Sequence, residues 1–124
     1  MLEAEHAHFI QGGVAICLAA RDAVNRPAIA RGLGCKMLDD GRRVAVFLAA
    51  SQAPGVLDNI AQNGAVAAVF CLPSSNRTLQ LKGTDAVAVA PQPGDAERIR
   101  CYVEAFAREV EPEGFRPEAM RVFL

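Results

Sequence analysis

The chain has 124 residues, of which 52% are hydrophobic and 22% are charged, and its formal net charge is -1. This length and balance predict one globular domain, residues 1–124, with a substantial core, and the near-neutral charge gives no bias toward nucleic acid. No apolar run approaches the ~20 residues that a membrane span needs, and the N-terminus lacks the features of a signal peptide, so we expect a cytoplasmic protein without a membrane partner.

The sulfur and imidazole side chains do not point to a metal site. Four cysteines are spread along the chain without a C-x-x-C pair: Cys17, Cys35, Cys71 and Cys101. We expect them to be reduced thiols, most of them in the core, as is usual in a cytoplasmic protein. The two histidines, His6 and His8, are too close in sequence to share one face of a helix, so no metal is expected there.

The hydrophobic pattern predicts the first elements of the chain. A short helix over residues 2–11 ends at a Gly-Gly pair, and an apolar run over 14–20 indicates a buried strand. A polar loop over 21–25 then leads to a second strand, which begins at Pro27.

The stretch 27–47 predicts two strands joined by a tight turn, and the rest of the chain is organised around it. The turn contains Asp39, Asp40 and Gly41, because Asp tolerates a left-handed backbone and Gly has no Cβ to forbid it. The returning strand is the apolar, β-branched run over 44–48.

The first strand of this hairpin carries Arg31 and Lys36, five residues apart, beside Gly32 and Gly34. An odd spacing puts two residues on opposite faces of a regular strand, but one extra residue in a bulge returns them to a common face. Glycine is typical of such bulges. The two cations can then converge on one anion, and the glycines would let a flat ligand approach the backbone.

Four further elements are predicted in the second half of the chain. A helix over 51–63 begins at a serine that can cap it and ends at an Asn-Gly stop. The run 65–72 is apolar throughout and predicts a strand buried on both faces. A long strand is expected over 77–90, with Gly83 marking a bulge or bend, and an amphipathic helix over 95–110.

These elements predict a mainly β fold with flanking helices, of the α+β class. Three consecutive strands, a helix, two strands and a helix favour antiparallel strands in a barrel or half-barrel over a parallel sheet. The apolar residues 120–124 form a tail that we expect to cover the barrel or a partner subunit.

Five sequence features follow one another over residues 14–90. They are a proline-led strand with Arg and then Lys (Pro27, Arg31, Lys36), the Asp39-Asp40-Gly41 turn, an apolar strand followed by Ser51 and Gln52, a helix ending in Ile60-x-x-Asn63, and a strand that runs from Arg77 to Gly83. In order and spacing they resemble the pyridoxamine 5′-phosphate oxidase-like family of FMN-binding proteins. This resemblance implies an antiparallel split β-barrel and a homodimer with FMN in a groove between two subunits.

The resemblance implies a phosphate site. Arg31 and Lys36, with Gly32 beside them, match positions that hold the FMN phosphate in the family, and a guanidinium fork plus an ammonium group suits a phosphate. Ser51 and Gln52 match the place where the family has a Ser and, shortly after, a Lys. That lysine is missing here, which lowers the expected affinity or shifts the phosphate. Ser51 is alternatively only the cap of the following helix.

The resemblance also implies contacts to the flavin ring and limits the substrate. Either Arg77 or Thr78 matches a position near the flavin where a glutamine is common, and Gln80 is the nearest amide. Family members that oxidise pyridoxamine phosphate bind it through an Arg-x-His near the C-terminus. This chain has no histidine after His8, so pyridoxamine phosphate is not the expected substrate.

The function implied by the resemblance is that of an FMN-dependent oxidoreductase acting on a small molecule. Because a flavin carries the redox chemistry itself, few catalytic side chains are needed, and none is identified. The alternatives are a non-catalytic dimeric module that holds a flavin or haem, and a dimeric domain that has lost its cofactor. The missing lysine favours the alternatives, whereas the pair of Arg31 and Lys36 favours the enzyme. The sequence does not distinguish FMN from a deazaflavin.

Overall fold

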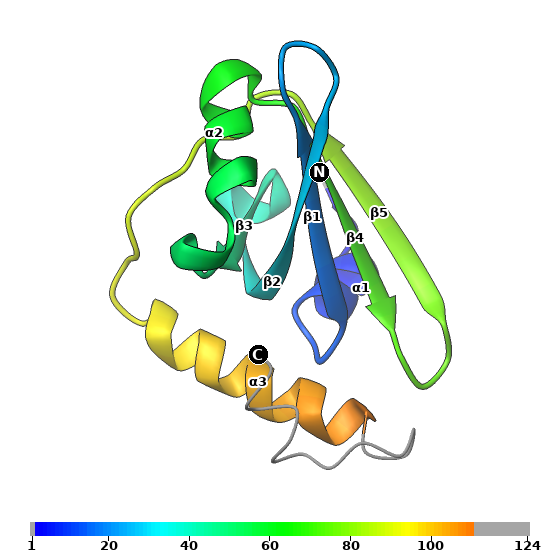
Figure 1. The fold of residues 1–124 in the computed structure, drawn as a ribbon. Coiled ribbons are helices and arrows are strands. Elements are labelled where there is room, and N and C mark those ends of the chain that lie inside the picture. Colours follow the sequence, from blue (N-terminus) through cyan, green and yellow to red (C-terminus); the bar gives the residue numbers. More distant parts are fainter. Residues whose placement is uncertain (1, 111–124) are drawn as a thin grey trace.

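The structure, a computed structural model, describes residues 2–110. One antiparallel sheet has the strand order β3-β2-β1-β4-β5, and three α-helices flank it (Figure 1). The strands are β1 (Ala15–Arg21), β2 (Pro27–Leu38), β3 (Arg43–Leu48), β4 (Val66–Leu72) and β5 (Arg77–Gly83). The helices are α1 (Ala4–Ile10), α2 (Pro54–Asn63) and α3 (Asp95–Val110), with single 3-10 turns at η1 (Asp39–Gly41) and η2 (Ala50–Gln52).

The α+β class and the antiparallel pairing are as predicted, but the sheet is open. Its two edge strands, β3 and β5, do not pair with each other among the described residues. None of the helices within residues 2–110 has the length and apolar character that crossing a membrane requires.

β2 is the strand that connects the two halves of the sheet. Residues 27–31 pair with β1, whereas 32–38 pair with β3. Between the pairs Gly32↔Leu48 and Cys35↔Val46, β2 uses one residue more than β3 does, which is the bulge predicted from the glycines. The extra residue places Arg31 and Lys36 on the same face, opposite to Gly32 and Cys35, so this prediction is confirmed.

The predicted turns are also present. Asp39 and Gly41 have φ values of 50° and 89°, the left-handed backbone expected of the turn between β2 and β3. Gly64 ends α2 in a left-handed conformation with φ 70°. The local sequence therefore specified where the β2–β3 turn lies and where α2 ends.

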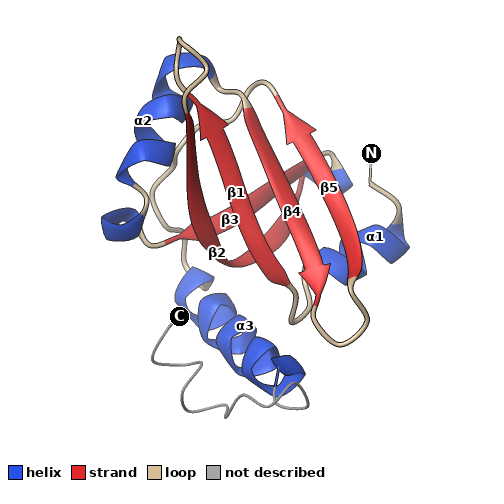
Figure 2. Cartoon of the chain, turned by 45° about the vertical axis from the view of Figure 1, so that its right-hand side comes forward, coloured by secondary structure: helices blue, strands red, loops and turns tan. Residues whose placement is uncertain are grey.

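The core lies on the inner face of the sheet. Buried side chains of the strands meet buried side chains of the helices there, and they include Ile16, Leu18, Phe70, Phe9, Ile10, Val56 and Ile60. α3 packs at one end of the sheet, where Tyr102 and Phe106 are buried. Figure 2 shows α3 beneath the strand ends, with β1, β4 and β5 turned toward the viewer and no described helix across them.

The prediction that β4 is buried on both faces is wrong. Ala68 and Phe70 are buried, but Ala67, Val69 and Cys71 on the opposite face are only partly buried. The reason is that an apolar strand is buried on two faces only if elements cover both, and the described helices leave the outer face open.

Two predicted boundaries differ from the structure. α2 begins at Pro54 and has no side-chain cap, because Ser51 lies earlier, in η2, with its side chain exposed. β5 ends at Gly83 rather than at residue 90, and residues 84–94 form an irregular connection to α3. Gly83 pairs with Val66, the first residue of β4, so the chain beyond Gly83 has no neighbouring strand with which to pair.

The prediction that most cysteines are in the core is also wrong. Cys35 is buried, Cys71 is partly buried, and Cys17 and Cys101 are exposed; all four are free thiols. Cys17 is exposed because it lies, like the partly buried Val69, on the uncovered outer face. The predicted apolar tail, residues 120–124, lies outside the described residues.

Candidate functional site

The outer face of the sheet brings together three of the predicted site residues. Strand register places side chains in rows across this face, and one row runs from Arg31 through Cys17 and Val69 to Gln80. Strands are ~4.8 Å apart, so this row spans about 14 Å from β2 to β5. Thr78 lies one row further along β5 on the same face as Gln80, because side chains alternate.

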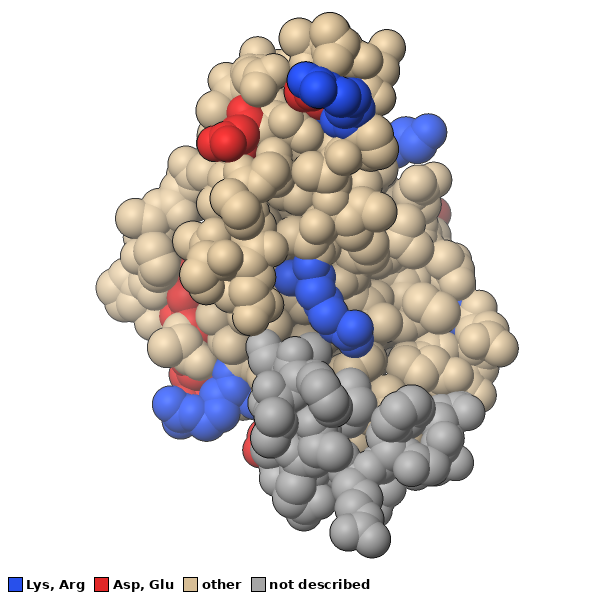
Figure 3. Space-filling model, viewed as in Figure 1, with Lys and Arg blue, Asp and Glu red and all other residues tan. Residues whose placement is uncertain are grey.

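The middle of this face is small and apolar. A shallow depression of about 350 Å³ crosses β1, β2 and β4, and of the residues that the structure describes Arg31 alone brings a charge to its lining. Its other lining residues are Ala15, Ile16, Cys17, Ile29, Ala30, Val69 and Cys71. In Figure 3 basic atoms cross the centre of a surface that is mostly uncharged, while other charged groups lie near the margin. The outer face is thus a flat platform with polar groups at two sides.

The guanidinium of Arg31 remains available to a ligand. The residue is exposed, and no carboxylate pairs with its side chain within residues 2–110. Its Cζ lies 5.2 Å from the centroid of the Phe106 ring, so a cation–π contact with α3 orients the guanidinium at the margin of the platform. The N–H donors of Arg31 make no hydrogen bond to any other of the described residues.

Lys36 is already engaged. Its Nζ lies 2.6 Å from Asp95 Oδ1 at the start of α3, and the two side chains are only 16% and 8% exposed. The Lys36 ammonium, together with the backbone N–H of Gln92, holds the pKa of the Asp95 carboxyl below its usual range. Asp95 and Phe106 are eleven residues apart, about 16 Å along a helix. Arg31 and Lys36 therefore share a face of β2 but are held at different ends of α3, and they do not converge on one anion.

The two glycines of β2 serve the internal packing. A Cβ at Gly32 would lie 2.5 Å from Ile16 Cγ2, and one at Gly34 would lie 3.1 Å from Tyr102 Cβ. Gly34 also has a φ of 121°, which L side chains rarely adopt. The space next to these glycines is taken by Ile16 and Tyr102. It is therefore not open to a flat ligand, contrary to the prediction.

Ser51 and Gln52 lie in η2, between β3 and α2, and both are exposed. The last residue of β3 pairs with Gly32, so the chain that leaves β3 passes beside the part of β2 that precedes Gly32. The start of α2 also contacts this part, since a Cβ at Gly55 would lie 3.1 Å from Ala28 Cβ. This connection is therefore at the Arg31 end of the bulge, not at the Lys36 end.

Arg77 lies away from the outer face. Its Nη2 is 3.0 Å from Glu5 Oε1 of α1, and its Cζ lies 4.6 Å from the centroid of the Phe9 ring. Thr78 and Gln80 alternate with it on β5 and lie on the outer face. Of the two alternatives that the sequence left open, Thr78 is the one that shares a face with Gln80 and Arg31.

Sequence reasoning missed Asp95 and Phe106, the residues of α3 that orient Lys36 and Arg31. An acidic residue in the first turn of a helix is common for local reasons, so nothing in the sequence indicates that Asp95 pairs with a lysine of β2. The alternation of Ala15, Cys17 and Ala19 with larger residues is the one signal that marks the platform.

Comparison of the chain with protein-family models, with curated proteins and with solved structures found no significant match.

Proposed function

We propose that this chain is an FMN-dependent oxidoreductase with a split-barrel fold, acting as a homodimer in which FMN lies on the outer face of the sheet. The observation that carries the proposal is the row from Arg31 to Gln80. It has a free guanidinium at one side, an amide and a hydroxyl at the other, and small apolar side chains between them over about 14 Å. FMN has a matching layout, with an anionic phosphate at one end and a planar ring with polar edges at the other.

The residues of the platform fit the cofactor in part. The guanidinium of Arg31 would bind the phosphate, and Ser51 and Gln52 would add donors if the phosphate extended past the edge of the sheet to the connection between β3 and α2. Thr78 and Gln80 would hydrogen-bond the polar edge of the ring, and the apolar platform would support its plane. Lys36 contacts the phosphate only if its ion pair with Asp95 opens. When bound, the flavin supplies the redox chemistry, and the protein binds and orients it.

A homodimer is proposed because the platform is an exposed, largely apolar face of an antiparallel sheet. Ile29 is 67% exposed at its edge, and Cys17 is exposed at its centre. Contiguous apolar surface of this kind usually marks an interaction site. A second copy that docks the same face through a two-fold axis would cover both platforms and enclose the ligand.

One observation favours a second candidate, a dimeric module that binds flavin or haem without turnover. The ion pair between Lys36 and Asp95, together with the missing lysine after Gln52, leaves Arg31 as the main cation for the phosphate. Weaker anchoring of the phosphate suits a binding module as well as an enzyme.

The cofactor is tested by the absorbance spectrum of the purified protein and by the mass of the extracted pigment. If Arg31 binds the phosphate, Arg31→Ala should weaken FMN binding by ~1.5–3 kcal/mol, or roughly 10- to 150-fold, because a charge-assisted hydrogen bond is lost. Arg42→Ala removes an exposed arginine of the β2–β3 turn and is the matched control. An unchanged affinity in Arg31→Ala would remove the phosphate assignment.

Turnover and assembly are tested separately. Slow anaerobic bleaching of bound FMN by NADH or NADPH is expected of the enzyme, whereas a flavin that stays oxidised in their excess supports the binding module. Light scattering should give a dimer, and a monomer at micromolar concentration would contradict the proposed enclosure of the ligand.

A further inference from the structure

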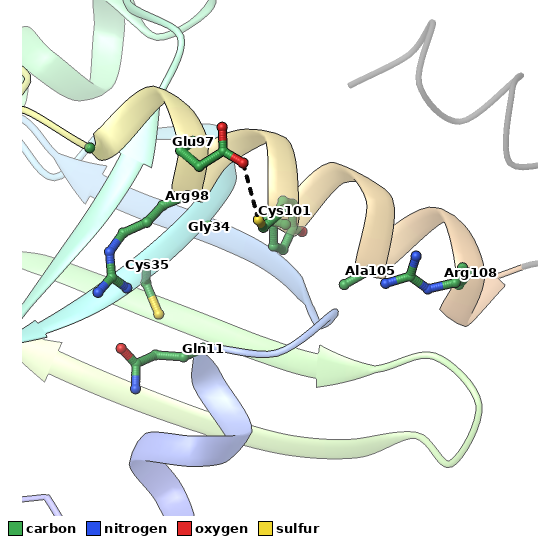
Figure 4. A pocket seen from close by; sticks show the side chains of 10 residues that line it. Gln11, Gly34, Cys35, Glu97, Arg98, Cys101, Ala105 and Arg108 are labelled. Carbon is green, nitrogen blue, oxygen red and sulfur yellow. Dashed lines mark hydrogen bonds between the residues drawn. The ribbon is translucent and has the colours of Figure 1, made fainter.

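A second cavity lies on the other side of α3, away from the platform. It has a volume of about 550 Å³ and shares no lining residue with the depression on the outer face. One wall is a face of α3, and the opposite wall is formed by the β2 bulge at Gly34 and Cys35 with Gln11 at the end of α1 (Figure 4). Its volume is in the range of small-molecule sites.

The cavity has a surplus of positive charge. Arg98 and Arg108 both line it, and neither has an ion-pair partner within residues 2–110. Glu97 also lines it, but its carboxylate accepts a hydrogen bond from Arg100 at 2.6 Å. Asp95, at the start of the same helix, is paired with Lys36. Asp95 and Glu97 thus have other cationic partners, although the charge of Arg98 also contributes to the lowered pKa of Asp95.

The two arginines stand at opposite ends of the cavity. They are ten residues apart, so their Cα atoms are about 15 Å apart along the helix axis. Cys101 and Ala105 lie between them on the same face of α3, and both have small side chains. In Figure 4 Arg98 extends toward Cys35 and Gln11, whereas Arg108 lies beyond Ala105. The result is a slot with a cation at each end, and the carboxylate of Glu97 lies near Cys101 between them.

The remaining polar groups of the slot do not supply a counter-charge. Burial raises the pKa of the Cys35 thiol to about 12, although the charge of Arg98 partly opposes this, and Cys35 Sγ lies 2.8 Å from the carbonyl oxygen of Ile10. Burial likewise raises the pKa of Tyr102, whose hydroxyl donates to the carbonyl oxygen of Val14. Both groups are neutral near pH 7 and are turned toward the protein.

We propose that this slot is a binding site for a small organic acid with two anionic groups, called a dianion below whatever the charge of each group, with one group held by Arg98 and the other by Arg108. Guanidinium groups bind carboxylates and phosphates through paired N–H donors, so dicarboxylates and phosphorylated acids share the required chemistry. The site is independent of the FMN proposal, because Arg31 and the platform belong to a different surface.

The test is calorimetric titration of the full-length protein with three probes: glutarate as a dicarboxylate, 3-phosphoglycerate as a phosphorylated acid, and acetate as a monoanion. At least one dianion should bind with one-to-one stoichiometry and at least tenfold more tightly than acetate. Its affinity should fall as salt is added, because exposed charges are screened. Comparison of the two affinities shows whether the second anionic group of the preferred ligand is a carboxylate or a phosphate.

Variants locate the site. Arg98→Gln and Arg108→Gln should each weaken the dianion at least tenfold, whereas Arg42→Gln, at an exposed arginine outside the slot, should change its affinity less than twofold. Circular dichroism checks the fold of each variant, and Arg98→Lys and Arg108→Lys replace any glutamine variant that fails to fold, with an expected loss of at least threefold. If neither dianion binds more tightly than acetate, or if both folded variants bind as the parent does, the proposal is wrong.

Discussion

Tyr102 makes the buried hydrogen bond that ties α3 to the start of β1. It is 5% exposed, its hydroxyl donates to the carbonyl oxygen of Val14 at 2.6 Å, and Val14 is 1% exposed. Tyr102→Phe removes only the hydroxyl and keeps the ring, which stacks on Phe106 with 5.9 Å between centroids and packs against Gly34. The variant therefore isolates this one bond between helix and sheet.

The expected loss of stability follows from the acceptor that remains. A buried carbonyl that loses its donor costs ~1–3 kcal/mol, and no cavity of methyl size or larger is created. With an unfolding entropy of about 2.1 cal/mol/K per residue, this loss corresponds to a drop in Tm of about 4–12 °C for a chain of this length. Urea unfolding followed by circular dichroism measures the free energy, with the slope m expected to stay unchanged. Thr84→Val, which removes an exposed hydroxyl, should cost less than about 0.5 kcal/mol.

The same bond has a signature at high pH. Burial raises the pKa of Tyr102 in the folded protein above its ordinary value of about 10. Above that pH the unfolded chain loses the phenolic proton first, so the contribution of the neutral tyrosine to stability is present below pH ~10 and is lost as the pH rises. The phenylalanine variant should lack this part of the decline. A cost below about 0.5 kcal/mol, with an unchanged alkaline profile, would refute the role given to this bond.

Two further variants test the bulge and the ion pair. Gly34→Ala should lower stability by ~2–4 kcal/mol in urea unfolding, because it combines a positive φ with a Cβ that would lie 3.1 Å from Tyr102 Cβ. Gly94→Ala, at a φ of 90° with no atom within 4 Å of the new Cβ, should show the strain alone. Because Lys36 lowers the pKa of Asp95, the stabilisation by this pair is present above pH ~4 and is lost as the pH falls through the folded-state value. Asp95→Asn should be less stable at neutral pH and lose less stability on acidification, and parallel urea midpoints for variant and parent would contradict this.

Much of the local structure was determined by neighbouring residues. The glycines of β2 specified a bulge that returns Arg31 to the face of Lys36, and the Asp-Asp-Gly turn and the stop at Gly64 specified where elements end. These features depend on the backbone conformations that a few adjacent side chains allow, so a single sequence reveals them.

The partners of the charged side chains were decided only by tertiary packing. Lys36 and Asp95 are 59 residues apart, and they meet because α3 packs across the β2 bulge. No short-range pattern encodes this contact. The register of β5 likewise turns Arg77 to the inner face of the sheet. There it contacts Glu5 and Phe9 of α1 and does not reach the outer face.

The exposure of Cys17 and the length of β5 were also decided by tertiary packing. Cys17 is exposed because no described element covers the outer face, and β5 ends at Gly83 because β4 begins at Val66 and offers nothing further to pair with. An apolar residue in a strand specifies a preference for burial, and an alternating pattern specifies a preference for pairing. Whether either preference is met depends on where distant segments of the chain end, and that depends on packing over the whole fold.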